Sequence, residues 1–93
     1  MIHEVVITPR AFKQLGRAPP NVGAKFLLWV RAVKVDGLEE VRRMPGYHDE
    51  PLRGRRTGQR SIRLNRSWRA IYTVGHSGAV EVARVEEITH HDY

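Results

Sequence analysis

The chain contains no cysteine in its 93 residues, which excludes a disulfide scaffold, a zinc site built on thiolates and a cysteine nucleophile. It also lacks a long apolar run, because the longest, Phe26–Val30, is far shorter than a membrane span. The stretch Met1–Glu4 includes an acid and is not the apolar core of a signal peptide. We therefore expect a single soluble domain over residues 1–93, located in the cytoplasm.

Lysine is scarce as well, with three residues against thirteen arginines, and the formal net charge is +6. Seven arginines fall between residues 53 and 69 with no acid among them: Arg53, Arg55, Arg56, Arg60, Arg63, Arg66 and Arg69. The remainder of the chain therefore has a formal charge of −1. Because the planar guanidinium suits bidentate contacts to phosphate, this cluster favours a phosphate-bearing partner.

The residue pattern predicts an α+β fold with the order β-α-α-(α)-β-β-β, a twisted antiparallel sheet with helices packed on one face. A β-branched strand at residues 3–7 is followed by Thr8-Pro9, a helix start, with the helix running to about Gly16. Apolar spacing predicts further helices at about 20–35 and 38–43. Alternation then predicts strands at 60–65, 68–74 and 79–88, after a loop at 47–58 and with a turn at 75–78.

This arrangement gives the arginines a common face. If the helices cover Ile62, Leu64, Trp68, Ala70 and Tyr72, then Arg63 and Arg69 point from neighbouring strands onto the opposite face. Like charges held so close cost free energy unless an anion lies between them, so the sequence predicts a phosphate pocket there.

Two segments supply groups for proton transfer. The last residues include His90, His91, Asp92 and Tyr93, and the loop before the arginine cluster includes His48 and Glu50. Imidazole, carboxylate and phenol can act as acid or base. The alternatives are a disordered polar tail and a solvated turn.

We expect neither metal nor cofactor. Although His48, Asp49, His90 and His91 are possible ligands, no paired spacing such as H-E-x-x-H is present. Glycine-rich nucleotide loops of the G-x-x-x-x-G-K-[ST] or G-x-G-x-x-G kind are also missing. Tyr47 and Tyr93 lie outside the predicted elements and could stack on a nucleobase.

Three stretches of the chain carry a resemblance to a known family. They are His48–Gly54, Gly58–Asn65 and Trp68–Tyr72, and the tail His91–Tyr93 adds a fourth. Together they resemble the RelE/ParE superfamily of type II toxins, and within it the HigB branch. The predicted element order also agrees with a RelE-like fold along nearly the whole chain.

The resemblance implies a toxin of a type II toxin–antitoxin system, an endoribonuclease that cleaves mRNA on the ribosome and so inhibits translation. In this family the ribose 2′-hydroxyl attacks the adjacent phosphate without a metal. The implied partners are the ribosome with its mRNA and a cognate antitoxin, often a helix-turn-helix protein such as those of the HigA kind. Operator DNA would be reached only through the antitoxin complex.

The resemblance also suggests roles. Arg69 follows the motif tryptophan as a phosphate-stabilising cation, Arg53 stands at the motif's basic position, and His91, Asp92 and Tyr93 match acid–base positions. Some relatives place a histidine directly before the proline of the motif, where this chain has Glu50. From the chemistry, we expect Arg63 and Arg69 to stabilise the phosphorane, His91 or Glu50 to act as base, and His90 or Tyr93 to donate a proton. The remaining expected RNA or phosphate contacts are Arg55, Arg56, Arg60 and His48.

Two other classes of function remain open. A ParE-like inhibitor of DNA gyrase would share the fold but needs no acid–base groups at the sheet edge. A non-catalytic nucleic-acid-binding module would explain the arginine cluster but not the histidines and carboxylates beside it.

Overall fold

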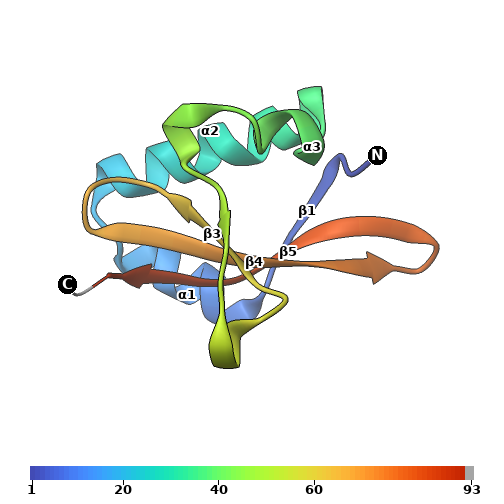
Figure 1. Cartoon of the computed structure of the whole chain (residues 1–93). Helices are drawn as coiled ribbons and strands as arrows, with labels where there is room; N and C mark the ends of the chain where they lie inside the picture. Colours follow the sequence, from blue (N-terminus) through green and yellow to red (C-terminus); the bar gives the residue numbers. More distant parts are fainter. Residues whose placement is uncertain (92–93) are drawn as a thin grey trace.

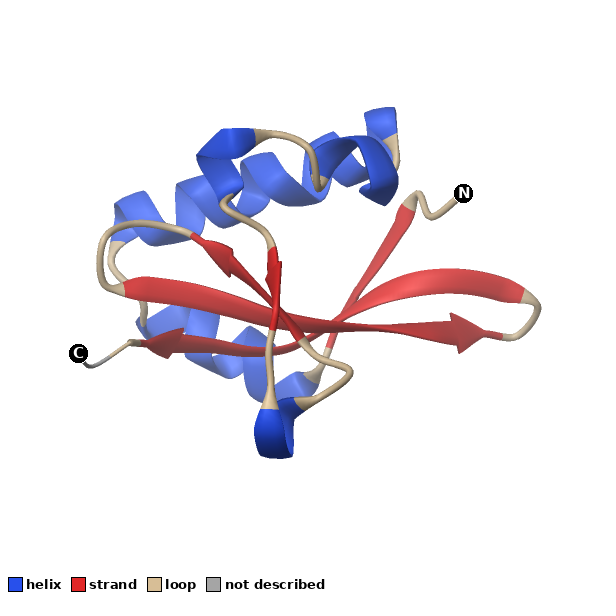
Figure 2. Ribbon diagram, in the orientation of Figure 1, coloured by secondary structure: helices blue, strands red, loops and turns tan. Residues whose placement is uncertain are grey.

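The computed structural model describes residues 1–91. In this part of the chain the helices and strands follow in the order β1 (Glu4–Ile7), α1 (Pro9–Arg17), α2 (Pro20–Asp36), α3 (Leu38–Val41), β2 (Glu50–Pro51), β3 (Arg60–Arg63), β4 (Trp68–Ser77) and β5 (Val80–His90). Short 3-10 turns, η1 (Pro45–Tyr47) and η2 (Gly54–Arg56), flank β2. The predicted α+β class is confirmed (Figures 1 and 2).

The strands form one sheet in the order β1-β5-β4-β3-β2. Neighbours β2 to β5 are antiparallel, but β1 runs parallel to β5, with Glu4 opposite Val82. The sheet is therefore mixed, which corrects the expectation of a wholly antiparallel one. The difference arises because three helices separate β1 from the other strands, and the pattern of β1 itself does not specify its partner.

A single hydrophobic core lies between α2 and the sheet. Val22, Phe26, Trp29 and Val33 of α2 are fully buried against the sheet residues Ile62, Ala70, Tyr72, Ala83 and Val85. The Trp29 ring packs between Phe26 and Tyr72, with ring centroids 6.0 and 5.4 Å away. Ile62, Ala70 and Tyr72 are among the residues that the sequence assigned to the helix-covered face of the sheet.

Helix α1 begins where the sequence predicts. The side chain of Thr8 accepts a hydrogen bond from the Ala11 amide at 3.1 Å, and Pro9 occupies the first turn. The helix packs beside β5, and the Gln14 side chain accepts a hydrogen bond from the Ile88 amide at 2.8 Å. Since β1 pairs only with Val82–Val85, α1 covers the edge of β5 that β1 leaves open.

Several predicted boundaries differ from the observed ones. The β4–β5 hairpin continues to Ser77, because Gly75 and His76 pair with Val82 and Glu81 where the sequence suggested a turn. Strand β5 continues to His90, two residues beyond its expected end. Within the described residues, no helix is long and apolar enough to cross a membrane.

Candidate active site

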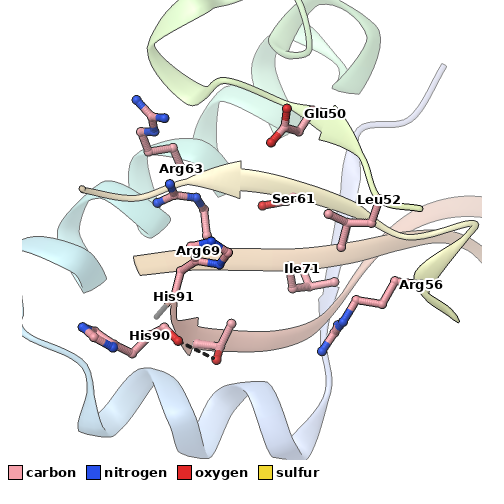
Figure 3. Close-up of a pocket in the computed structure, with 10 residues that line it drawn as sticks. Glu50, Leu52, Arg56, Ser61, Arg63, Arg69, Ile71, His90 and His91 are labelled. Atoms are coloured by element: carbon pink, nitrogen blue, oxygen red, sulfur yellow. Dashed lines mark hydrogen bonds between the residues drawn. The ribbon is translucent and has the colours of Figure 1, made fainter. Parts of the chain in front are cut away.

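The open face of the sheet, opposite the core, carries a pocket of about 400 Å³. Its lining comes from β2 to β5 and the segments that flank them: Glu50, Leu52, Arg56, Ser61, Arg63, Arg69, Ile71, Thr89, His90 and His91. Figure 3 shows Arg63 and Arg69 at one end of this pocket and Arg56 at the other. Strands β2 to β5 and the segments next to them thus bring candidate cations, a carboxylate and imidazoles together.

Arg63 and Arg69 are direct neighbours, as predicted. They are paired across β3 and β4, and Thr89 of β5 faces Arg69 on its other side. The Arg63 side chain is exposed, whereas Arg69 is only 8% exposed. Their guanidinium groups form a concentrated positive site at this end of the pocket, which can bind a phosphate group.

The turn between β3 and β4 holds Arg69 in place. Its Nη1 donates to the carbonyl oxygens of Asn65 at 2.8 Å and Trp68 at 3.0 Å. Asn65 shapes this turn, because its side-chain oxygen accepts hydrogen bonds from the Ser67 and Trp68 amides at 2.8 and 2.9 Å. Backbone carbonyls thus orient the guanidinium without removing its positive charge.

The chain after β5 is fixed to the same turn. The His91 amide donates to the carbonyl oxygen of Ser67, and His91 lines the pocket. His90 also borders the pocket, but its imidazole makes an edge contact with Trp68, with ring centroids 5.6 Å apart. Since Trp68 packs against the core, this contact places the His90 ring on the helix side of the sheet. Asp92 and Tyr93 lie outside the described residues.

Glu50 forms the opposite wall of the pocket. Glu50 belongs to β2, a two-residue strand that the sequence pattern does not reveal, and it pairs with Ser61 of β3. The Oε2 atom of Glu50 lies 3.6 Å from Nε2 of His48, which adopts a left-handed conformation with φ of 46°. His48 does not itself line the pocket, so the structure places Glu50 at the site and His48 behind it.

Asp49 points to the other side of the sheet and anchors this wall. Its carboxylate, with no exposed area, accepts from Arg60 Nε and from the Tyr72 hydroxyl, each at 2.6 Å. Arg42 Nε donates to the Tyr72 hydroxyl at 3.1 Å. Burial, together with the hydrogen bond to Asp49, raises the pKa of Tyr72 above its ordinary value. Arg60 is thus committed to an ion pair on the side away from the pocket.

The other arginines of the cluster divide into two groups. Arg56 lines the pocket, and its Nη1 lies 2.7 Å from Oε2 of Glu87. Arg53, directly before η2, and Arg55, within η2, are exposed and do not line the pocket. The described residues contain no group of three or more histidines and carboxylates placed to hold a metal.

Sequence reasoning missed Glu87. A β-bulge between β4 and β5 pairs Ile71 with Glu87 and Tyr72 with Val85, which leaves Glu86 as an extra residue. Glu86 accepts a hydrogen bond from Thr73 at 3.1 Å, so both carboxylates lie on the open face. Strict alternation would place only one of two adjacent residues there, and no residue pattern identified the bulge.

Comparison with known proteins identifies the fold. Neither the family models nor the curated proteins compared contain a match to this chain. Solved structures do match, among them the YoeB/ParE toxin from Agrobacterium tumefaciens, 23% identical over 96% of this chain and 99% of that one, with a TM-score of 0.68. YafQ from E. coli is 17% identical over 95% and 92%, with a TM-score of 0.72.

A third match comes from the heterotetrameric YoeB–YefM toxin–antitoxin complex of Staphylococcus aureus. The matched chain of that complex is 18% identical to this one, over 99% of this chain and 100% of its own length, with a TM-score of 0.68. The chain therefore has the fold of these toxins, in agreement with the RelE-like fold that its sequence predicts. These neighbours do not specify the HigB branch.

Proposed function

We propose that this chain is the toxin of a type II toxin–antitoxin system and cleaves mRNA on the ribosome. The observation that carries the proposal is the pocket itself, in which the Arg63–Arg69 pair faces Glu50 and adjoins His91. A phosphate-binding site with acid–base groups at its edges suits phosphodiester cleavage. The solved structures of the same fold, named as toxins, support the same class of function.

The proposed reaction is a metal-free transesterification. A base takes the proton from a ribose 2′-hydroxyl, the oxygen forms a bond to the adjacent phosphorus, and the bond to the 5′-oxygen breaks. The leaving oxygen receives a proton, and a 2′,3′-cyclic phosphate remains. Arg63 and Arg69 stabilise the charge on the phosphorane, an electrostatic effect worth several kcal/mol of barrier.

Glu50 and His91 are the candidate bases, since both line the pocket. Proton transfer by one positioned group contributes about 10²–10⁴ in rate. Tyr93 and His90 are the candidate proton donors, and the contact between His90 and Trp68 favours Tyr93. Asp92 would orient the neighbouring imidazole, while Arg53, Arg55 and Arg56 would bind flanking phosphates.

The proposed partner is a cognate antitoxin, in the cytoplasm. The matched YoeB is itself part of a toxin–antitoxin complex. In this chain, Leu27, Leu28 and Val35 leave an exposed apolar stripe on α2, at 58%, 60% and 68% exposure. Such a stripe on a chain with net charge +6 suits an acidic amphipathic segment. The antitoxin could carry the helix-turn-helix domain that binds operator DNA.

The central test is the substitution Arg69→Ala. We expect it to abolish growth arrest and to lower cleavage of ribosome-bound mRNA by a factor of about 10² or more, because a preorganised cation is lost. Primer extension on mRNA after induction measures the cleavage. Arg66→Ala, which removes an exposed arginine from the same turn, is the matched control and should remain toxic.

Retained toxicity of Arg69→Ala would overturn the assignment. An intact message combined with gyrase-dependent DNA damage would instead favour the ParE-like function, for which one neighbour's name, YoeB/ParE, gives a reason. Alanine variants of Glu50, His91 and Tyr93 in the same assay assign the base and the acid. An open reading frame for a small helix-turn-helix protein beside the coding sequence would support the antitoxin.

A further inference from the structure

Glu87 is a nearly buried carboxylate on the open face of the sheet, with its side chain 11% exposed. Its two oxygens contact cations from opposite directions. Oε2 lies 2.7 Å from Nη1 of Arg56, in η2, and Oε1 lies 3.5 Å from Nη2 of Arg10, in the first turn of α1. The Glu87 carboxylate thus connects η2, between β2 and β3, with α1, near the start of the chain.

This triad keeps a net positive charge of one. Each guanidinium has five N–H donors, and the carboxylate engages only one from each side. Arg56 uses the same Nη1 to donate to Gln59 Oε1 at 2.9 Å. The side chains of Arg10 and Arg56 are 69% and 47% exposed, so both are accessible to a ligand from solvent.

The contacts with Glu87 reduce the conformational freedom of the two arginines, more for Arg56 at 2.7 Å than for Arg10 at 3.5 Å. A phosphate that binds them pays less conformational entropy than it would for two freely moving side chains. Since the carboxylate is already buried and paired on both oxygens, it serves to place the cations. It does so without cancelling their combined charge.

Arg56 of the triad and the Arg63–Arg69 pair lie at the two ends of the same pocket, along β5 (Figure 3). Thr89 faces Arg69 directly, and Glu87 is two residues before it on the same face of β5. Two residues along a strand span roughly 7 Å. The backbone spacing between Glu87 and Thr89 is thus of the order of one phosphate-to-phosphate step in an extended single strand.

We propose that Arg10 and Arg56, held by Glu87, form a second phosphate-binding subsite for a single-stranded RNA. This subsite takes a phosphate next to the one bound by Arg63 and Arg69. The inference rests on the proposed function and extends it, because Arg10 belongs to a helix that contributes nothing to the pocket lining. The RNA path then runs from the β3–β4 turn across β5 towards α1.

Binding of a short single-stranded RNA with methylated 2′-hydroxyls, which block cleavage, tests the subsite. Its affinity is measured by fluorescence anisotropy at several salt concentrations. Loss of one phosphate contact reduces the slope of log K against log salt by about 0.7, which corresponds to roughly fivefold weaker binding at 0.1 M salt. We expect this result for Arg10→Ala, whose exposed side chain is not needed for the fold.

Arg31→Ala is the matched control, because it removes the same charge from an exposed position on α2. It should leave the slope unchanged. The double variant of Arg10 and Arg56 should lose less than the product of the two single losses, since both residues bind one phosphate. Equal slopes for Arg10→Ala, Arg31→Ala and the unmodified protein would overturn the subsite.

The outcome is separable from that of the proposed function. If the unmodified protein binds the RNA with the expected contribution of Arg10 but cleaves no message on the ribosome, the subsite stands and the nuclease assignment fails. If it cleaves message and Arg10→Ala shows no loss of affinity, the nuclease assignment stands and the subsite fails.

Discussion

At the scale of single residues, Asp49 shows how a charge buried beneath the site supports it. Both carboxylate oxygens are paired, one with Arg60 and one with the Tyr72 hydroxyl. We expect Asp49→Ala to lower the free energy of unfolding by about 3 kcal/mol, because it leaves a partly buried cation and a buried hydroxyl without their partner. Urea unfolding followed by circular dichroism measures the change.

If Asp49→Ala does not fold, the loss of stability has the expected direction but its size cannot be measured. Tyr72→Phe is therefore the second variant. It removes one hydrogen bond to the carboxylate and should cost about 1–3 kcal/mol. Glu40→Ala breaks an exposed ion pair with Arg43 and should change stability by less than about 1 kcal/mol. Equal effects of Asp49→Ala and Glu40→Ala would contradict the role given to the buried network.

The sequence reveals only part of this residue-scale picture. Strand alternation correctly predicts that Arg63 and Arg69 share a face, because period-2 patterning follows from backbone geometry. The same alternation puts Arg60 on the face of Ile62, opposite to that of Arg63, but it does not identify the partner of Arg60. Its ion pair with Asp49 depends on a two-residue strand, β2, whose pairing is set by tertiary contacts.

At the scale of elements, α1 replaces the missing strand partner along the second half of β5. The Ile88 amide, which β1 is too short to reach, donates to the Gln14 side chain at 2.8 Å. Gln14→Ala should therefore cost about 1–3 kcal/mol of stability, because it leaves a backbone donor unpaired. Gln14→Glu retains an acceptor and should cost less. Hydrogen exchange at the Ile88 amide, faster in Gln14→Ala alone, checks the local effect.

The elements themselves were more predictable than their connections. The start of α1 and the apolar face of α2 follow from local chemistry, namely a capped proline turn and helical spacing. The partner of β1 and the β-bulge at Glu86 involve residues far apart in the chain. Local patterns do not specify such pairings, so the sheet was expected to be antiparallel throughout and Glu87 was not assigned to the site.

At the scale of the whole molecule, repulsion between Arg63 and Arg69 links anion binding to stability. A ligand that binds only the folded state adds about 2.7 kcal/mol at a hundred times its Kd. For a domain of this size, that raises Tm by on the order of 10 °C. We expect the cleavage-resistant RNA to produce such a rise, measured by thermal unfolding. Arg69→Ala should lose most of it, and an undiminished rise in that variant would contradict the phosphate pocket.

The parallel pairing of β1 with β5 has a consequence for biosynthesis. Translation proceeds from the amino terminus, so β1 cannot join the sheet until the residues that pair with it, such as Val82 opposite Glu4, have been synthesised. Contacts so distant in sequence slow folding, because a long loop must close first. The same strand, β5, supplies Thr89 and His90 at the pocket and leads into His91. A nascent chain that ends before β5 therefore lacks both a complete sheet and one wall of the pocket. The complete pocket forms only after β5 has emerged, so the ribosome that makes the protein does not meet a formed site before then.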